Sequence, residues 1–409
     1  MELRVEQRAT ANIPWVLVIG VLLTAAVGIY NLASASRSPS SPCATDASCA
    51  VGSSCKAGNC TTQSSPVWTS QLLYLAFGIA LVVVLSLVDY RLIQRATVPL
   101  YLLNVAALIA LKWFGHTAKG AESWFVLGPF RIQPAEFMKL GMVLMLAKYF
   151  HDDDRPNEPA QGFLRLIPAG AIALLPIGLV LVQPDLGTAL MMVFTAVTII
   201  LFSKPSLPVS IAFGLIVAIS GGVLWNDYIR EQPEPRFTVL RQKLKKHQDA
   251  RISGWLDPTS DLKGTGYHAM QSKIAVGSGG WSGKGWKAGT QTGLRYLPEQ
   301  HTDFIFSVFA EEQGFARCLL LLILYGVLLL GGLGVALTAK ERYGAFVAIG
   351  ICAMIFWQVF ENIGMVTGLL PITGITLPLM SYGGSSMVSV MIGIGLLVNV
   401  SLRRQMFRG

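Results

Sequence analysis

A histidine and an aspartate stand where a long polar, glycine-rich stretch of the chain gives way to an apolar run. Residues Leu297–Phe306 read LPEQHTDFIF, with His301 and Asp303 two positions apart. Histidine and carboxylate side chains are the groups that most often transfer protons in enzymes. An acid at the edge of a membrane is costly and is therefore a candidate for function. The stretch predicts chemistry at a membrane surface.

The composition identifies the elements that must position these residues. Of 409 residues, 53% are hydrophobic and 13% are charged, whereas soluble domains have about 25% charged residues. A membrane-spanning helix needs about 20 mainly apolar residues. We find ten such runs, near 14–34, 69–88, 98–114, 134–150, 163–183, 185–203, 207–225, 303–338, 344–370 and 377–401. We therefore predict an all-α polytopic membrane protein with a single domain, residues 1–409.

The short loops predict the orientation of these helices. Lys and Arg concentrate in alternate loops, and cytoplasmic loops retain positive charge, so both termini are predicted to be cytoplasmic. Residues 226–302 then form a long outer loop between the seventh and eighth helices, with 12 Lys or Arg against seven Asp or Glu. A basic loop of this kind suits anionic partners such as lipid phosphates, whereas nucleic acid is not expected on the outer face of a membrane. Alternatively, Arg4, Arg8 and Ala33–Ala35 around the first run match a cleaved signal peptide.

Four polar motifs begin the helices that start from the outer face. They are Leu297–Phe306, Gln133–Lys139, Gln183–Thr188 with Asp185, and Leu379–Ser386 with Ser381 and Tyr382. Taken singly, each acid is explained by capping, because an acid in the first turn complements the helix dipole by about 0.3–1 kcal/mol. Glu136 and Lys139 also share a helix face and can neutralise each other. Their common position on one side of the membrane favours a shared site.

The glycine-rich stretch Gly277–Gln291 resembles a nucleotide-binding loop without the context of one. The spacing G-x-G-x-x-A begins at Gly283, but no strand and helix surround it, and the spacing of a Walker loop is not met. Its backbone N–H groups, with Lys284, Lys287 and Arg295, suit a diphosphate instead. A mobile basic loop is the alternative.

A cysteine-rich segment, residues 36–66, lies between the first two apolar runs. It contains Cys43, Cys49, Cys55 and Cys60. Four cysteines outside the membrane fit two disulfides, with three possible pairings. The C-x5-C-x5-C-x4-C spacing lacks the C-x2-C of zinc sites and the segment has no histidine, so disulfides are favoured over zinc. Cys318 and Cys352 lie inside apolar runs and are predicted to be buried packing residues.

Together these motifs resemble one family. Gln133-Pro134-x-Glu136-x-x-Lys139, Gln183–Ala189, Leu297–Phe306 and Pro378–Ser385 are similar in content and order to the SEDS family of cell-shape, division and sporulation proteins. The resemblance covers the chain from about the second apolar run to the end. Residues Gln271–Gly280, followed by Gly283–Trp286 and Gly289–Gln291, are similar to the elongation branch, RodA, rather than to the division branch, FtsW.

The resemblance implies a peptidoglycan glycosyltransferase of the bacterial cytoplasmic (inner) membrane. Such an enzyme polymerises undecaprenyl-linked lipid II on the outer face during cell-wall elongation and releases undecaprenyl pyrophosphate. The resemblance also implies a class B penicillin-binding protein as transpeptidase partner, together with other membrane proteins of the elongation complex.

By the same resemblance, individual residues receive roles. An inverting transfer from a lipid diphosphate needs a base on the acceptor hydroxyl, and Asp303 matches the catalytic aspartate of the family. The candidates for substrate binding or site shaping are Glu136, Lys139, Asp185, His301, Gln271, Lys273, Lys284, Ser381 and Tyr382. His301 fits three roles: orienting Asp303, binding phosphate or a purely structural one.

Other polar residues of the apolar runs are interpreted more conservatively. Glu311, Glu312, Glu361 and Asn362 are predicted to be helix-packing groups or supports of the site. No metal-ligand motif stands out, although a divalent cation, Mg²⁺ or Mn²⁺, between a carboxylate and pyrophosphate is chemically reasonable.

The chain departs from the family pattern in three places. Ser123 stands where the family usually has the arginine of Gly-Ala-x-Arg-Trp, which removes a cation suited to phosphate. Ala135 replaces the serine of Gln-Pro-Ser-Glu, and the cysteine-rich segment is an addition. The first two departures put local substrate contacts in question, and the third suggests a modified partner surface or localisation.

Two other functions suit a polytopic protein with acids in its helices. A lipid flippase, a role proposed for this family, would place charges near the membrane midplane, often on discontinuous helices in repeated halves. These acids cluster instead at the outer helix ends, and no internal repeat is evident. A non-catalytic scaffold that activates a transpeptidase is the second alternative. Peptidoglycan polymerisation is the function we predict.

Overall fold

The computed structural model describes residues 13–36, 53–56, 59–62, 67–118, 121–127, 130–153, 163–203, 246–257, 264–294, 296–297 and 299–403, with isolated helical positions between 211 and 223. Within these residues, six helices are long and apolar enough to cross a membrane. They are α2 (Trp15–Ala35), α3 (Val67–Leu87), α4 (Tyr90–Phe114), α12 (Ile305–Thr338), α13 (Arg342–Thr367) and α14 (Gly384–Leu402). The chain is a mostly helical, polytopic membrane protein, as its composition predicts.

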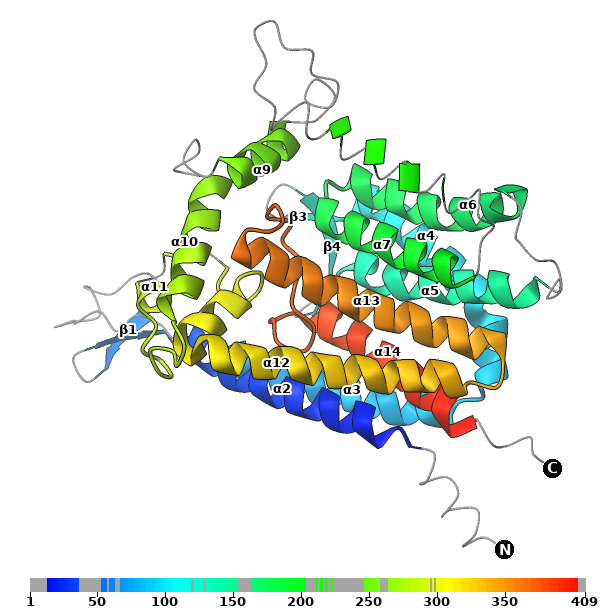
Figure 1. Cartoon of the computed structure of the whole chain (residues 1–409), viewed down its shortest axis with the longest axis horizontal. Coiled ribbons are helices and arrows are strands. Elements are labelled where there is room, and N and C mark those ends of the chain that lie inside the picture. Colours follow the sequence, from blue (N-terminus) through cyan, green and yellow to red (C-terminus); the bar gives the residue numbers. More distant parts are fainter. Residues whose placement is uncertain are drawn as a thin grey trace, which may run out of the picture.

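Three more helices pack with α4 and α13. They are α5 (Pro134–Asp152), α6 (Phe163–Val182) and α7 (Leu186–Phe202). Helix α5 begins with proline at its first position, where a helix leaves the backbone N–H unpaired in any case. In Figure 1, α13 runs between this group and a second group formed by α2, α3, α12 and α14. Both groups therefore contribute residues to the surroundings of α13.

Short helices gather at one end of the bundle (Figure 1). Helices α9 (Lys246–Leu256), α10 (Thr265–Ser278) and α11 (Thr290–Gly293) belong to the predicted long loop, and α10 packs against α12 and α13. Strands β1 (Ser53–Lys56) and β2 (Asn59–Thr62) form a hairpin. Strands β3 (His116–Ala118), β4 (Ala121–Leu127) and β5 (Phe130–Ile132) form an antiparallel sheet. Such short elements carry too little periodicity to be predicted from the sequence.

The end of α13 and the start of α14 differ from the predicted runs. Helix α13 ends at Thr367 and is followed by Gly368 in the left-handed conformation (φ 81°), a common helix terminator. Residues 369–383 form a loop that contains no helix, which we call the 369–383 loop. Its prolines, Pro371 and Pro378, cannot donate helical hydrogen bonds. The predicted run 377–401 therefore starts in this loop, and Ser381 and Tyr382 precede the helix.

Helix α12 is interrupted at Gly314, which the sequence analysis did not predict. Gly314 has φ 74° and ψ 177°, outside the helical region. Residues 311–316 exchange four backbone hydrogen bonds with residues 280–285 of the glycine-rich stretch, with N···O distances of 2.8, 2.9, 3.0 and 3.1 Å. A Cβ atom at Gly283 or Gly314 would overlap the opposing backbone. Unpaired backbone groups are costly in a membrane, and these hydrogen bonds pair the groups that the break exposes. Glycine is needed on both sides because a Cβ atom would prevent the close approach.

The predicted cysteine pairs are only partly covered by the described residues. Cys43 and Cys49 lie outside them, and the register of the β1–β2 hairpin sets Cys55 opposite Cys60. The two disulfides stay a prediction. Cys318 and Cys352 are buried in α12 and α13, which confirms them as packing residues. The predicted helix at 207–225 also lies mostly outside the described residues.

Candidate active site

Asp303 lies in the turn that immediately precedes α12. The backbone of this turn is held at three consecutive carbonyls. Tyr382 N–H donates to the His301 carbonyl (2.9 Å), the Ser381 hydroxyl to that of Thr302 (2.6 Å), and the Asn362 amide to that of Asp303 (2.9 Å). One helix, α13, and the loop that precedes α14 thus fix the position of the acid through its main chain.

The carboxylate of Asp303 lies against the 369–383 loop. A Cβ atom built on Gly374 would be 3.4 Å from Asp303 Oδ2. Gly374 has φ 81°, a conformation that favours glycine, and it is exposed, while Asp303 is half-buried. The carboxylate is therefore close to the surface, at a place where the loop carries no side chain.

The 369–383 loop is itself held by buried polar side chains from several helices. Gln71 of α3 donates to the Ser381 carbonyl (3.0 Å), and the Tyr325 hydroxyl of α12 donates to that of Pro378 (2.6 Å). Gln358 of α13 donates to the carbonyl oxygen and to Oγ1 of Thr376 (3.1 and 3.2 Å). The loop is therefore a fixed wall of the site.

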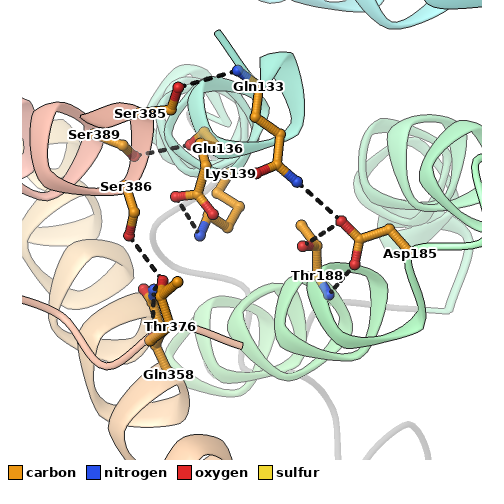
Figure 2. Close-up of polar contacts among 10 residues, drawn as sticks. All are labelled: Gln133, Glu136, Lys139, Asp185, Thr188, Gln358, Thr376, Ser385, Ser386 and Ser389. Carbon is orange, nitrogen blue, oxygen red and sulfur yellow. Dashed lines mark hydrogen bonds and ion pairs between the residues drawn. The ribbon is translucent and has the colours of Figure 1, made fainter. Parts of the chain in front are cut away.

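A second group of polar residues surrounds the start of α5 (Figure 2). Glu136 and Lys139 form an ion pair of 2.8 Å, with side-chain exposures of 8% and 1%. The Ser389 hydroxyl of α14 donates to the Glu136 carbonyl (2.8 Å). This pair confirms the expectation that the two residues share a helix face and neutralise each other.

Asp185 caps α7 and connects it to α5. Its carboxylate accepts from the backbone N–H of Thr188 (3.1 Å), the Thr188 hydroxyl (2.8 Å) and the side-chain amide of Gln133 (3.2 Å), as Figure 2 shows. A capping role of this kind is the simple explanation of an acid just before a helix. Both acid groups of this region are engaged with protein side chains.

The start of α14 joins the two regions. Ser385 accepts from Gln133 N–H (3.1 Å), and Ser386 shares a hydrogen bond with Thr376 of the 369–383 loop (2.9 Å; Figure 2). The same loop faces Asp303 at Gly374. The structure thus brings the four predicted polar motifs together at neighbouring helix ends.

Glu361, predicted as a helix-packing group or a support of the site, is a buried acid. It is 2% exposed on α13, and Thr373 lies beside its carboxylate. Lys139 and Asp185 are its charged neighbours. The signal was present in the sequence, because an acid within an apolar helix is a candidate for function by default.

Lys284 and Glu311 hold the glycine-rich stretch against α12. Their side chains form an ion pair of 2.7 Å, and Glu311 is completely buried. The Glu311 carboxylate also accepts from the backbone N–H groups of Thr290 (2.8 Å) and Gln291 (3.0 Å) at the start of α11. These contacts agree with the packing role predicted for Glu311, and they engage the Lys284 ammonium within the protein.

The other predicted residues lie at the edges of this arrangement. Lys273 of α10 packs against Gly368 at the end of α13 so closely that any Cβ there would overlap it. Gln271 is half-buried on the same helix. The ring centroids of His301 and Tyr382 are 6.0 Å apart. Ala135 is buried, so apolar packing occupies the position where a serine was expected.

The described residues contain no group of three or more His, Cys, Asp or Glu side chains arranged to hold a metal ion. The divalent cation stays a prediction.

Comparison with known proteins places the chain among cell-wall proteins. Residues 50–406 match the family model "cell cycle protein" of FtsW, RodA and SpoVE. The chain is 37% identical over 332 residues to peptidoglycan glycosyltransferase MrdB of Escherichia coli K12, covering 81% of this chain and 85% of that protein. It is 37% identical over 334 residues to stage V sporulation protein E of Bacillus subtilis, covering 81% and 86%.

Solved structures give the same result. A chain from a peptidoglycan synthase complex, described as coordinating polymerization and crosslinking, is similar with a TM-score of 0.73 and 28% identity, covering 96% of this chain and 98% of that chain. The crystal structure of the rod shape determining protein RodA of Thermus thermophilus is similar with a TM-score of 0.65 and 27% identity, covering 96% and 97%.

Proposed function

Because the chain belongs to the FtsW, RodA and SpoVE family of cell cycle proteins, we propose that it is a peptidoglycan glycosyltransferase with Asp303 as its general base. Several relatives that match most of its length are named peptidoglycan glycosyltransferases. The observation that carries the residue assignment is the held Asp303 turn, with its carboxylate against an exposed glycine. A base needs such a fixed position close to the substrate.

The reaction joins two lipid II molecules. The 4-hydroxyl of the acceptor sugar attacks the anomeric carbon of the donor with inversion, and the bond from that carbon to the lipid pyrophosphate breaks. Asp303 accepts the hydroxyl proton, and the pyrophosphate leaves with the bonding electron pair. One carboxylate is sufficient, because a diphosphate leaves without being protonated.

The second polar region supports this reaction by shaping the site. The charge of Lys139 is balanced by Glu136 at 2.8 Å, so the pair contributes a fixed dipole rather than a mobile cation. Asp185 orients Gln133 and the start of α7. We assign Glu136, Lys139 and Asp185 a structural role around the substrate, and Gln271, Lys273, His301, Ser381 and Tyr382 a position at the rim of the site. Lys284 holds the glycine-rich stretch there.

We propose ten membrane spans with both termini in the cytoplasm. The alternation of Lys- and Arg-rich loops supports this orientation. Residues 226–302 then lie outside, and the active site faces the outer surface of the bacterial inner membrane. Helix α12 begins two residues after Asp303 and packs against α10 of this loop, which fits the assignment.

The partner we propose is a class B penicillin-binding protein within the elongation complex. The likeness to a chain of a peptidoglycan synthase complex supports a crosslinking partner, and the motifs of the glycine-rich stretch favour elongation over division. Depletion of the protein tests that choice: rounded cells support elongation, and filaments would contradict it.

The experiment for the reaction is polymerisation of lipid II by the purified protein with its transpeptidase partner. We expect glycan chains from the native protein and none from a folded Asp303→Ala variant. Unchanged polymer from that variant would overturn the general-base assignment. The break in α12 is the observation that favours transport, because transporters often use discontinuous helices. Movement of lipid II across vesicle membranes without polymer would therefore favour a flippase.

A further inference from the structure

Asn362 joins the Asp303 turn to the 369–383 loop. It lies on α13 and is completely buried. Its amide nitrogen donates to the carbonyl oxygens of Asp303 (2.9 Å) and Ile375 (2.6 Å). A primary amide has two N–H donors, so both are used. Its amide oxygen has no partner within the described residues, so the side chain is held there as a double donor.

The two acceptors belong to the two segments that meet at the Asp303 carboxylate. One is the main chain of Asp303 itself, and the other is Ile375, which follows the glycine that faces Asp303 Oδ2. A single amide thus sets the distance between the acid and the wall that it faces. Ser381 adds a second hold on the turn at the neighbouring carbonyl of Thr302.

We propose that Asn362 is a positioning residue for the reaction and acts through Asp303. This inference rests on the proposed role of Asp303 as general base. Loss of the two donors leaves the Asp303 carboxylate chemically unchanged, but it removes one of the three hydrogen bonds that hold the turn and the link between the turn and the loop. A displacement of about 1 Å at a reacting group can lower turnover by about 10²-fold.

Helix α13 offers a matched control one turn earlier. Gln358 is 1% exposed, and it also uses a side-chain amide to hold the 369–383 loop. Both of its hydrogen bonds go to Thr376 of the loop. Removing the Gln358 amide therefore costs two hydrogen bonds to the loop, whereas removing the Asn362 amide costs one to the loop and one to the Asp303 turn.

The test compares kcat and KM for lipid II polymerisation, with the transpeptidase partner present, and the melting temperature in detergent. The variants are Asn362→Ala, Asn362→Asp, Gln358→Ala and Asp303→Asn. Asn362→Asp keeps the shape of the side chain and lacks both donors. We expect both Asn362 variants to lose about 10²-fold in kcat with KM close to native. Gln358→Ala is expected to lower the melting temperature similarly and kcat much less.

The outcomes separate this inference from the general-base assignment. Native kcat in Asp303→Asn would overturn the assignment of the base. If Asp303→Asn is inactive, the assignment of Asp303 as general base is supported. If the Asn362 variants then have the same kcat as Gln358→Ala, the positioning role of Asn362 is overturned. If neither Asn362 variant folds, Ser381→Ala tests the same turn at the neighbouring carbonyl. The inference requires kcat of the Ser381→Ala variant to fall while its KM stays unchanged. A native kcat in this variant would overturn the inference.

Discussion

The two acidic regions of the site are held in different ways. In the Asp303 turn, the donors of Asn362, Ser381 and Tyr382 bind main-chain carbonyls. In the region around α5, side chains bind side chains: Glu136 pairs with Lys139, and Asp185 binds Gln133 and Thr188. An acid fixed through its backbone can change its protonation without losing its position. This difference is why we separate chemistry from site shaping.

The largest expected effect is on turnover in the Asp303 turn. Asp303→Asn keeps the size of the side chain and removes the base, so kcat for lipid II polymerisation should fall by about 10²–10⁴-fold. The melting temperature should stay within a few degrees of native, because the backbone contacts of the turn are retained. A large loss of melting temperature would show that the carboxylate has a structural role like that of Asp185.

The second-largest effect should be a loss of folding stability on changing the ion pair of α5. Lys139→Met leaves Glu136 buried without its partner, and breaking a buried pair costs about 3–5 kcal/mol of folding free energy. The double variant Glu136→Gln with Lys139→Met removes both charges and should recover most of that loss. Thermal unfolding in detergent measures both. A double variant no more stable than Lys139→Met would show that the pair is not coupled as its geometry indicates.

A smaller effect is expected at the wall opposite Asp303. Gly374→Ala introduces a methyl group 3.4 Å from Asp303 Oδ2 and places alanine at φ 81°. We expect kcat to fall about tenfold, in addition to a strain of about 1–2 kcal/mol. Gly280→Ala is the matched control, because Gly280 also has positive φ (53°) but an added Cβ meets nothing within 4 Å. Equal losses of kcat in both variants would attribute the effect to strain alone.

The smallest effect should come from the cap of α7. Asp185→Ala removes the acceptor for Thr188 and Gln133, which should cost about 0.5–2 kcal/mol. Asp185→Asn caps a helix about as well, so its melting temperature should be close to native and its turnover should change only a few-fold. Loss of polymerisation in a stable Asp185→Asn protein would move Asp185 from the structural group to the reacting groups.

Part of the site could be predicted because its residues are neighbours in sequence. Glu136 and Lys139 are three positions apart, so helix geometry alone predicts their contact. Asp185 directly precedes an apolar run, where a capping acid is expected. The role of Asn362 could not be predicted in this way, because its acceptor in Asp303 is 59 positions away. The contact between Gln71 and Ser381 spans 310 positions.

The interruption of α12 shows the same limit. Gly314 stands in a long apolar run, and a glycine there is compatible with a continuous helix. The break exists because residues 280–285 supply backbone partners for the groups that it exposes. Neither segment alone indicates that the other will be beside it.

The sequence by itself determined the membrane class, most of the helices, the four polar motifs and the family. These depend on local composition and spacing, because burial in lipid acts on each run of about 20 residues separately. Only the tertiary structure decided which donors hold the Asp303 turn, how Gly374 faces its carboxylate and where α12 breaks. These features depend on the close packing of helices distant in sequence, since a hydrogen bond requires its two atoms within about 3 Å of each other.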